Sequence, residues 1–529
     1  LGMKKLLIRL PQGLKAVREL GLAQTFWYAV YQVGMRSGFY RRATPTRPYP
    51  TLTTRILSPF AIPDRQQMQR VLGSQLEPLI AEANAVAAGQ VCLFGGPVVP
   101  LVLAPPDATR HWTAYEARPK TWGVEDLKFL WEPARFGWVY GLGRAFAITA
   151  DEKYPAAFWE NFKTFLNANP LNQGPNWSSA QEAALRLLAF IYAAGAFKQS
   201  SSSTPAQFEC LAGAIAVHAQ RILPTLSYAR AQNNNHRITE ALGLYAAGCT
   251  LPDHPLAKGW RKTGWDEINR AFQSQIEPDG TYAQHSMNYH RLMLHAALQA
   301  QLFGQAFPQA TARRLAAAAL WLLAQVDPQS GRVPNLGSND GANILPLSSG
   351  EFGDFRPAGQ AAARAFLGQA AFPPGAWDEM ALWLRQPMLD SPPLPALPQS
   401  PAVHRLGDSH SWATVRAVRF KSRPSQADQL HIDLWWRGEN IALDAGTYRY
   451  TAAAPWDNAL GQTFVHNTVE VGGQNQMRRA GRFLWLDRAQ ARLFDTRSFS
   501  NDAIAAQHDG YQHLGVLHKR SLKKSGNNH

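Results

Sequence analysis

The period of the apolar side chains changes at a proline-rich stretch, residues 387–401. Before it, from about residue 124, apolar residues recur at intervals of three and four, which is typical of amphipathic helices. After it, apolar and polar residues alternate, which is typical of half-buried strands. Proline-rich segments form extended, semi-rigid linkers. The sequence therefore predicts a helical part and an antiparallel sheet part, joined by this linker.

The predicted helices are separated by short loops that contain Gly, Pro and Asn. They span residues 124–149, 154–168, 178–197, 205–224, 236–248, 262–274, 288–305, 309–326, 358–368 and 375–385. Antiparallel helix pairs with loops this short build either an (α/α) toroid or an α-solenoid. Because the sequence has no clean internal repeat, we expect a toroid, covering residues 106–386.

The region before the toroid, residues 1–105, is predicted to be an N-terminal arm. A basic, aromatic helical stretch at 14–42 is expected to pack on the body of the protein rather than on a membrane surface. A helix is expected at 64–88, followed by a β-like piece at 91–103.

The sheet part is expected to cover residues 402–529. Its predicted strands span residues 412–420, 430–436, 440–443, 464–471 and 482–486. Because this set is small for a complete sheet domain, the sequence leaves open that the domain is truncated.

Composition narrows the kinds of partner. The 529 residues carry a formal net charge of +15, but no run of five basic residues and no nucleic-acid-binding motif is present. Nucleic acid is therefore not an expected partner. Isolated arginines suit carboxylate and sulfate groups, because the guanidinium presents a planar fork of N–H donors. The oligomeric state is left open.

The cysteine and hydropathy patterns argue against further kinds of protein and site. Cys92, Cys210 and Cys249 lie far apart and form no CxxC pair, so neither a disulfide framework nor a cysteine-based zinc site is expected. No segment reaches the ~20 apolar residues that span a membrane, and the N-terminus lacks the apolar region of a secretory signal. We expect no stable membrane insertion.

Three asparagines and a histidine, Asn233 to His236, precede an apolar run. Asparagine is a good helix N-cap, and Glu240 falls in the first turns, where the helix dipole favours a carboxylate. The free N–H groups of a helix start suit an anionic ligand. A polar cap without further function is the alternative. Because three amides and an imidazole exceed the needs of one cap, Asn234, Asn235 and His236 form a candidate site.

A second cluster follows a Pro-Asp-Gly turn at residues 278–280. The loop after this turn is predicted to place two tyrosines and two histidines before the next helix, among them Tyr289 and His290. Such a cluster at the mouth of a helical ring is a candidate for acid–base chemistry. The alternative is that Tyr289 is a core residue with a satisfied hydroxyl group.

A third pattern combines Asn176 and Trp177 with Glu182 and Arg186 on the following predicted helix. Residues four apart share a helix face and can form an ion pair. A structural salt bridge and a contact with a substrate explain this pair equally well.

The strands of the sheet part carry a candidate metal site. His431 and Asp433 are two residues apart and therefore face the same way along a strand. A turn at Gly438 returns Asp444 to the side of His431, and a third strand supplies His466. Two imidazoles and a carboxylate form a zinc-binding set with room for a fourth ligand. The alternative is a pair of hydrogen-bonded histidines without a metal ion.

In their order and domain placement, these motifs resemble the heparinase II/III-like family of polysaccharide lyases, which also includes oligoalginate lyases. The resemblance covers about residues 120–520 and includes segments 126–132, 176–177, 235–236, 279–290, 335–340, 431–466 and 481–485. The family implies an incomplete (α/α) toroid followed by an antiparallel β-sandwich, with a cleft between them. It also implies an acidic polysaccharide or oligosaccharide as the partner.

The reaction implied by this resemblance is β-elimination at a uronic acid, which gives a 4,5-unsaturated sugar. The proton at C5 is removed, the 4-linked oxygen leaves, and the charge that gathers at the carboxylate must be stabilised. By resemblance, Asn235 supplies an amide donor, and His236 or Tyr289 is the base. Tyr289 is also implied as the acid, with Tyr448 or Tyr450 assisting. A phenol that acts as a base needs a lowered pKa, which nearby positive charge or metal would provide.

The resemblance also leads us to expect substrate contacts. The substrate-binding residues that we expect are Asn234, Trp177, Glu240, His290 and Arg186. His431, Asp444 and His466 match the metal positions of the family, where zinc mostly organises the cleft.

Two features depart from the family pattern. Gln429 stands where relatives often have the first histidine of a His-x-His-x-Asp motif, and the interval from His431 to Asp444 is short. If that histidine takes part in the chemistry of relatives, one function is missing here.

Two alternatives to a lyase remain open at this point. A glycoside hydrolase on a helical barrel would use two carboxylates, for which Glu182, Glu277, Asp279 and Asp340 are candidates. A non-catalytic binder of acidic glycans would use the same cleft without turnover. The compartment is also left open, since the family implies a periplasmic or secreted protein whereas no signal is visible.

Overall fold

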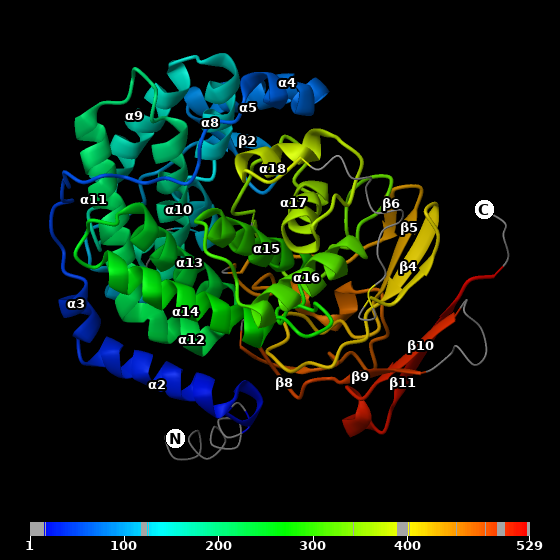
Figure 1. Cartoon of the computed structure of the whole chain (residues 1–529). Coiled ribbons are helices and arrows are strands. Elements are labelled where there is room, and N and C mark those ends of the chain that lie inside the picture. Colours follow the sequence, from blue (N-terminus) through cyan, green and yellow to red (C-terminus); the bar gives the residue numbers. More distant parts are fainter. Residues whose placement is uncertain are drawn as a thin grey trace.

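The computed structural model describes residues 15, 17–117, 124, 126–341, 343–388, 400, 403–450, 452–481, 483–494 and 503–525. Helices dominate the part before residue 388, and short antiparallel strands dominate the part after residue 403 (Figure 1). The predicted division into a helical part and a sheet part is confirmed. Most of the predicted linker, residues 387–401, lies outside the described residues.

Most helices begin and end within a few residues of the predicted segments, but the single helices predicted at 64–88 and 124–149 are each divided into two. The helices are α2 (Leu22–Arg36), α3 (Phe39–Ala43), α4 (Arg65–Leu72), α5 (Leu76–Ala87), α6 (Trp112–Ala117), α7 (Leu127–Ala134), α8 (Val139–Thr149), α9 (Lys153–Ala168), α10 (Ala180–Ala196), α11 (Pro205–Ile222), α12 (Leu226–Gln232), α13 (Asn235–Thr250), α14 (Ala257–Gln275), α15 (Met287–Leu302), α16 (Gln309–Leu323), α17 (Arg356–Leu367) and α18 (Glu379–Trp383). The short helix α12, directly before the asparagine run, was not predicted.

Side-chain caps explain several helix starts. The side chains of Asp64, Asp126, Asn234 and Ser286 accept hydrogen bonds from backbone N–H groups in the first turns of α4, α7, α13 and α15. The prediction that Tyr289 and His290 lie in the loop before this helix is wrong, because α15 starts at Met287 and both residues lie in its first turn.

The core of the helical part is built around α10, which is buried along almost its whole length and packs against α8, α11 and α13. A buried ion pair adds to this core. Arg144 on α8 donates from Nε and Nη2 to the Glu379 carboxylate of α18, both at 2.6 Å, which ties the last helix to the centre of the bundle.

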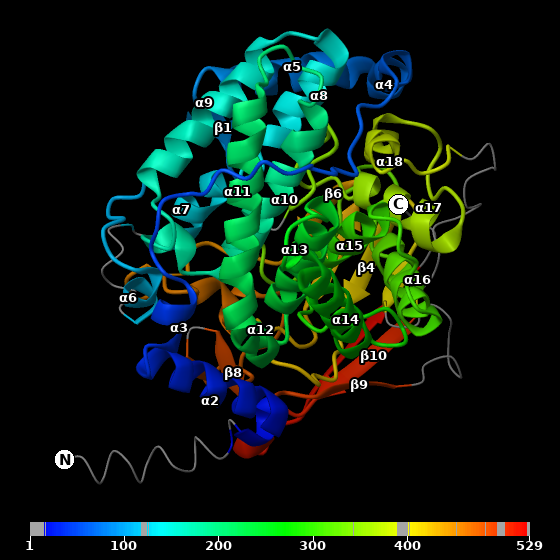
Figure 2. The ribbon, with the colours of Figure 1, turned by 60° about the vertical axis from the view of Figure 1, so that its left-hand side comes forward.

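The helix α2 packs along α12, and both views of the ribbon place it at the base of the helical part (Figures 1 and 2). Tyr31 is buried there, and Arg230 of α12 lies 4.8 Å from the ring centre of Trp27. The predicted packing of this stretch on the body is confirmed. Over the described ranges, no helix combines the length and apolar character needed to cross a bilayer.

The strands form antiparallel sheets with the orders β1-β2, β3-β4-β5-β6, β7-β8 and β11-β10-β9. They are β1 (Gln90–Cys92), β2 (Val98–Pro100), β3 (Arg405–Gly407), β4 (Ser411–Val415), β5 (Ile432–Trp436), β6 (Glu439–Ala442), β7 (Arg478–Gly481), β8 (Leu484–Leu486), β9 (Ala491–Phe494), β10 (Ala503–His508) and β11 (His518–Lys523).

The strand predicted at residues 464–471 is wrong. The first of these residues lie in a short 3-10 turn, Thr463–Val465, and polar side chains of the segment bind the backbone of neighbouring segments. Asn467 Nδ2 donates to the carbonyl oxygens of Ile432 and Leu443, both at 3.2 Å. Side-chain bonds of this kind replace the ladder that a strand would make. The strand predicted at 412–420 is also too long, because β4 ends at Val415 and the chain leaves the sheet as a loop.

A buried histidine in the helical core is fixed in its neutral form. His218 Nδ1 lies 2.7 Å from the carbonyl oxygen of Ala214, and Arg186 Nε donates to His218 Nε2 at 2.8 Å. Because the guanidinium is always a donor, Nε2 accepts and Nδ1 carries the proton. Burial, together with the charge of Arg186, holds the pKa of His218 well below its ordinary value.

The low pKa of His218 predicts that the free energy of unfolding depends on pH. In the unfolded chain His218 takes up a proton below about pH 6.5, whereas in the folded chain it does not, so the free energy of unfolding falls as the pH drops. We expect His218→Gln, which does not titrate, to lower this slope by up to about 1.4 kcal/mol per pH unit in urea titrations between about pH 6.5 and 5. His513→Gln, at an exposed histidine, is the control and should keep the wild-type slope. Equal slopes in all three proteins would contradict the assignment.

Candidate functional site

A large cavity lies where the helical part meets the sheet part. Its volume is about 1410 Å³, which exceeds the ~300–1,000 Å³ of ordinary small-molecule pockets and suits an elongated ligand. Its walls come from α2, α7, α10, α12, α13, α15 and the loop that follows β4. Asn234, Asn235, His236, Tyr289 and Tyr450 all line it, so the structure brings these predicted residues together.

Amide side chains hold the start of α13 in place. Asn234 Oδ1 accepts from His236 N at 3.1 Å, as the capping prediction requires. Asn235 is supported twice: its backbone N donates to Gln284 Oε1 at 2.9 Å and its Nδ2 donates to Gln181 Oε1 at 3.1 Å. An amide nitrogen carries two hydrogens, so Asn235 Nδ2 keeps one N–H for a ligand.

His236 is the more accessible member of this pair, with 27% of its side chain exposed. Its Nδ1 lies 3.6 Å from Glu240 Oε1 on the next turn of α13. Glu240 is buried, and burial raises the pKa of its carboxyl group, opposed by His236. Glu240 therefore lies behind the imidazole and does not line the cavity.

Two tyrosines from different parts of the chain share one carboxylate. Tyr289 OH donates to Asp340 Oδ2 at 2.8 Å. Burial raises the pKa of Tyr289 well above its ordinary value, and the charge of Asp340 adds to the rise. The pKa of Tyr450 is raised by the same two causes. A base function of Tyr289 would need a lowered pKa, whereas burial and Asp340 raise it and outweigh the opposing charge of Arg135. Both phenols are therefore protonated near neutral pH.

Tyr450, rather than Tyr448, faces the cavity. Tyr448 is 49% exposed and does not line it. The backbone N of Tyr450 donates to Asp126 Oδ2 at 2.7 Å, and the other oxygen of Asp126 caps α7 by accepting from Lys128 N at 3.1 Å. One buried carboxylate thus fixes a sheet-part residue to a helix.

Arg135 is a cavity residue that the sequence did not single out. Its Nε and Nη2 donate to Glu182 at 2.6 and 2.9 Å, and its Nη1 donates to Glu132. Glu182 therefore pairs with Arg135 and not with Arg186. Burial raises the pKa of Glu132 to about 7, with Arg135 opposing the rise and Glu182 and Asp340 adding to it. The sequence signal for Arg135 was its position three residues after segment 126–132.

Three residues expected to contact the substrate are fully buried and do not line the cavity. Trp177 packs on His218, with ring centres 4.6 Å apart and an angle of 38° between the rings. Arg186 donates to His218 and to the carbonyl oxygens of Ala134 and Asn176. His290 stacks on Trp321 at 4.6 Å. These side chains support the walls of the site from behind.

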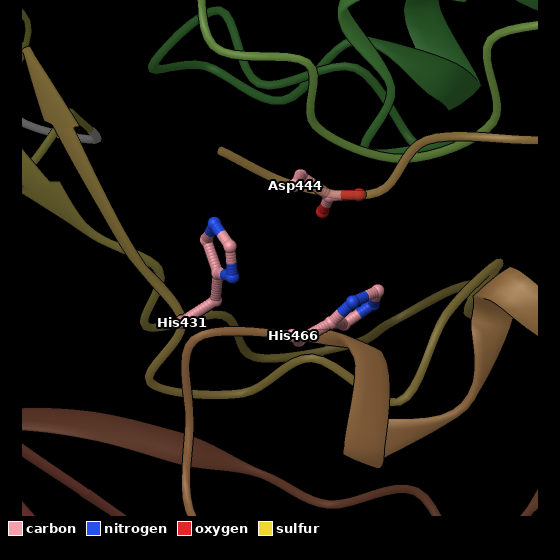
Figure 3. Close-up of side chains that lie close together, drawn as sticks. All are labelled: His431, Asp444 and His466. Carbon is pink, nitrogen blue, oxygen red and sulfur yellow. The ribbon is translucent and has the colours of Figure 1, made fainter. Parts of the chain in front are cut away.

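The predicted metal ligands converge in the sheet part. One ligand atom each from His431, Asp444 and His466 lies within 4.8 Å of the other two, and Figure 3 shows the three side chains facing a common point. All three residues are buried. His431 also lines the large cavity, whereas Asp444 and His466 do not.

The chemistry of this trio fits a divalent cation. His431 Nε2, both ring nitrogens of His466 and Asp444 Oδ2 are buried without a hydrogen-bond partner in the described part of the chain. Buried polar atoms are normally satisfied, so this group of orphan atoms indicates a missing ligand. Burial raises the pKa of Asp444 to about 6, which a bound cation would reverse. His431 Nδ1 accepts from Asn467 N at 3.1 Å, and coordination through Nε2 would move the ring proton to Nδ1 and replace this contact.

Gln429 is a structural residue. Its Nε2 donates to the carbonyl oxygens of Val418 and Ala489 at 2.6 and 2.8 Å, and its Oε1 accepts from Val418 N at 3.0 Å. The side chain is fully buried and bridges three segments of the sheet part. A histidine could not make the same set of bonds, because its ring has one donor or acceptor at each nitrogen.

Comparison with known proteins supports the predicted resemblance. The family described as Heparinase II/III N-terminus matches residues 109–336, and the one described as Heparinase II/III-like, C-terminal, matches residues 391–528. The heparin-sulfate lyase of Pedobacter heparinus is 23% identical over 385 residues, which covers 67% of this chain and 54% of that protein. The heparin-sulfate lyase of Bacteroides thetaiotaomicron is 28% identical over 159 residues, covering 30% and 22%.

The fold agrees with these matches. A crystal structure of heparinase III superposes with a TM-score of 0.58 at 15% identity, covering 95% of this chain and 75% of that one. The matched regions span between about a fifth and a half of the two curated relatives. Because the two family matches together cover most of the chain and fall on the helical and the sheet part in turn, the chain belongs to the heparinase II/III-like family.

Proposed function

We propose that this protein is a polysaccharide lyase that cleaves an acidic polysaccharide or oligosaccharide at a uronic acid by β-elimination, giving a 4,5-unsaturated sugar. The observation that supports this most is the convergence of Asn235, His236, Tyr289 and Tyr450 on one cavity between the two matched parts. Because relatives are named heparin-sulfate lyases, glycosaminoglycans are the first substrates to consider.

The first requirement of this reaction is to stabilise charge on the substrate carboxylate. Arg135 is already paired with two carboxylates, so it brings little net positive charge to the reaction centre. The remaining N–H of Asn235 Nδ2 is the donor that we assign to this task. Gln181 and Gln284 hold Asn235 in position before the substrate arrives, and such preorganised donors are the most effective form of electrostatic stabilisation.

The protonation state of Tyr289 determines its function in proton transfer. A phenol that is protonated in the free protein is suited to give its proton to the leaving oxygen, so Tyr289 is assigned as the acid. His236 is then the base that takes the C5 proton. Glu240 lies beside His236 Nδ1, which leaves Nε2 for the substrate and stabilises the imidazolium that forms. Tyr450 assists from the sheet part.

The remaining residues of the predicted substrate set receive revised functions. Asn234 lines the cavity and stays a proposed contact, in addition to capping α13. Glu240 orients His236. Trp177, Arg186 and His290 are proposed to act only through packing, because none of them reaches the cavity.

We propose zinc as the metal held by His431, Asp444 and His466, since two imidazoles and a carboxylate are typical zinc ligands. When bound, it would add positive charge beside the cavity and fix the segments that carry Tyr450. The proposed fold is an incomplete (α/α) toroid, residues 106–386, and an antiparallel β-sandwich, residues 402–529. An N-terminal arm, 1–105, and a linker, 387–401, complete the proposed division.

The direct test is incubation with heparan sulfate, hyaluronan, alginate and glucuronan while ultraviolet absorbance is recorded. A lyase creates a conjugated double bond, so we expect absorbance to rise with at least one substrate. New reducing ends without this absorbance would identify a hydrolase instead. Binding without either signal would identify a non-catalytic glycan binder.

Removing the proposed acid should stop turnover but not binding. We expect Tyr289→Phe to lower kcat by about 10²–10⁴-fold, the usual contribution of general acid–base catalysis, and to change glycan affinity only a few-fold. Tyr448→Phe is the matched control, because this exposed phenol lies outside the cavity, and it should keep wild-type activity. Undiminished activity of Tyr289→Phe would remove Tyr289 from the mechanism.

The metal site makes a separate prediction. We expect the purified protein to hold about one zinc ion per chain, because a histidine pair and a carboxylate form a near-complete site. Chelation should lower the thermal unfolding midpoint, and added zinc should restore it. His466→Ala should show the same low midpoint without any restoration by zinc. A wild-type midpoint that responds to neither chelator nor zinc would contradict the site.

A further inference from the structure

The sheet part contributes a row of cations to the cavity. The loop between β4 and β5 places Arg416, Arg419, Lys421 and Arg423 along its wall. Two of them have carboxylate partners: Arg416 lies 2.7 Å from Asp428, and Lys421 lies 2.7 Å from Glu277. The two remaining cations, Arg419 and Arg423, therefore determine which ligands this wall attracts.

Arg423 has a neutral partner only. Its Nη2 donates to Gln232 Oε1 at 2.9 Å, and within the described ranges no carboxylate lies at ion-pair distance from it. The side chain is half-buried, and its pKa is lowered first by burial and then by the charge of Arg488. A partly desolvated cation without a counter-ion is stabilised when an anion binds beside it.

Arg488 is a further cation of this wall, but it has an acidic neighbour and so does not add to the uncompensated positive charge. It lines the same cavity, and Glu19 lies 3.8 Å from its Nε, while its other donors bind the carbonyl oxygens of Glu19 and Lys421. The second cation on this wall, Arg419, is exposed and has no ion pair in the described part of the chain. The wall thus carries two uncompensated guanidinium groups.

Aromatic rings lie next to Arg423. Tyr28 of α2 is 51% exposed and lines the cavity. Tyr228 of α12 also lines it and packs on Tyr31 with ring centres 4.4 Å apart. Tyr228 and Gln232, the partner of Arg423, are four residues apart on α12, and Tyr28 and Tyr31 are three apart on α2, so each pair shares a helix face and the side chains of Arg423, Tyr228 and Tyr28 meet in one region of the wall. Figure 2 shows α2 lying beneath α12, and the two helices pack against each other.

This group is close to the reaction centre. Gln232, the partner of Arg423, is the last residue of α12, and Asn235 follows three positions later. The Cα atoms of Gln232 and Asn235 are therefore at most about 10 Å apart. An anion bound to Arg423 and a carboxylate bound to Asn235 can then belong to neighbouring units of one polymer. A cation beside an exposed aromatic ring suits a sugar with an acidic substituent, because the ring covers the apolar face of the sugar.

We propose that Arg423 and the ring of Tyr28, supported by Gln232 and Tyr228, form a second subsite that binds a carboxylate- or sulfate-bearing sugar next to the sugar that is cleaved. This inference rests on the proposed function, because the second anion is placed relative to the cleaved uronic acid. It requires substrates with anionic groups on successive sugars.

The test is calorimetric binding of oligosaccharides to Tyr289→Phe, in which turnover is blocked. Adding Arg423→Gln should weaken binding of a heparan sulfate hexasaccharide roughly tenfold to a hundredfold, the usual value of a hydrogen bond to a charged group. Arg423→Lys should fall between the two, since it keeps the charge and loses the fork. Tyr28→Ala, at an exposed position outside the core, should weaken binding several-fold and provides a test that does not alter Arg423.

A matched control is present elsewhere in the chain. Arg47 Nη2 also donates to a glutamine, Gln220 Oε1, at 2.7 Å, but Arg47 does not line the large cavity. Arg47→Gln should leave affinity unchanged. An unsulfated glucuronan hexasaccharide separates the two anions: weakening of both ligands by Arg423→Gln identifies a carboxylate, and weakening of the sulfated one alone identifies a sulfate.

The outcomes also separate this inference from the proposed function. A wild-type protein that produces unsaturated sugar, with affinity unchanged in both Arg423→Gln and Tyr28→Ala, would overturn the subsite and leave the lyase intact. A protein without lyase activity whose glycan affinity falls in these variants would keep the anionic-sugar site and overturn the lyase. Loss of affinity in Arg47→Gln as well would show a general charge effect and contradict the subsite.

Discussion

The site depends on one buried carboxylate that joins the two parts of the chain. Asp126 caps α7 with one oxygen and accepts from the backbone of Tyr450 with the other, although the two residues are far apart in sequence. Nearby, Asn335 Nδ2 donates to the carbonyl oxygen of Asp444 at 3.3 Å and Asn339 N donates to Thr447 Oγ1 at 2.9 Å, so the segment that follows β6 is fixed to the helical part at several points. These bonds position a phenol and a metal ligand from the sheet part against the start of α13.

Much of this arrangement could be predicted from local pattern. The change of apolar period placed the boundary between helices and strands, and the asparagine run marked the start of α13, because capping depends on a few consecutive residues. His431 and Asp444 were found from the strand and the turn that follows it, and His466 was found as well, although the strand predicted around it is wrong. These features are encoded over short stretches, so sequence is sufficient for them.

What could not be predicted depends on tertiary contacts. Arg186 and Glu182 share a helix face, yet Glu182 binds Arg135 and Arg186 binds His218, since the choice of partner is made by other helices. Trp177 and His290 looked like ligand-contacting residues and are packed behind the wall. The raised pKa of Tyr289 arises from burial and from Asp340, which lies 51 residues away in sequence. No local pattern reports burial of this kind.

In the proposed reaction, one acidic sugar lies between Asn235, His236 and Tyr289, with the sheet part closing over it. A crystal structure of the Tyr289→Phe protein with a bound uronic-acid oligosaccharide tests it most directly. We expect a uronate carboxylate within hydrogen-bond distance of Asn235 Nδ2, with C5 of the same sugar facing the His236 imidazole. An oligosaccharide bound with its uronate away from both residues would contradict it.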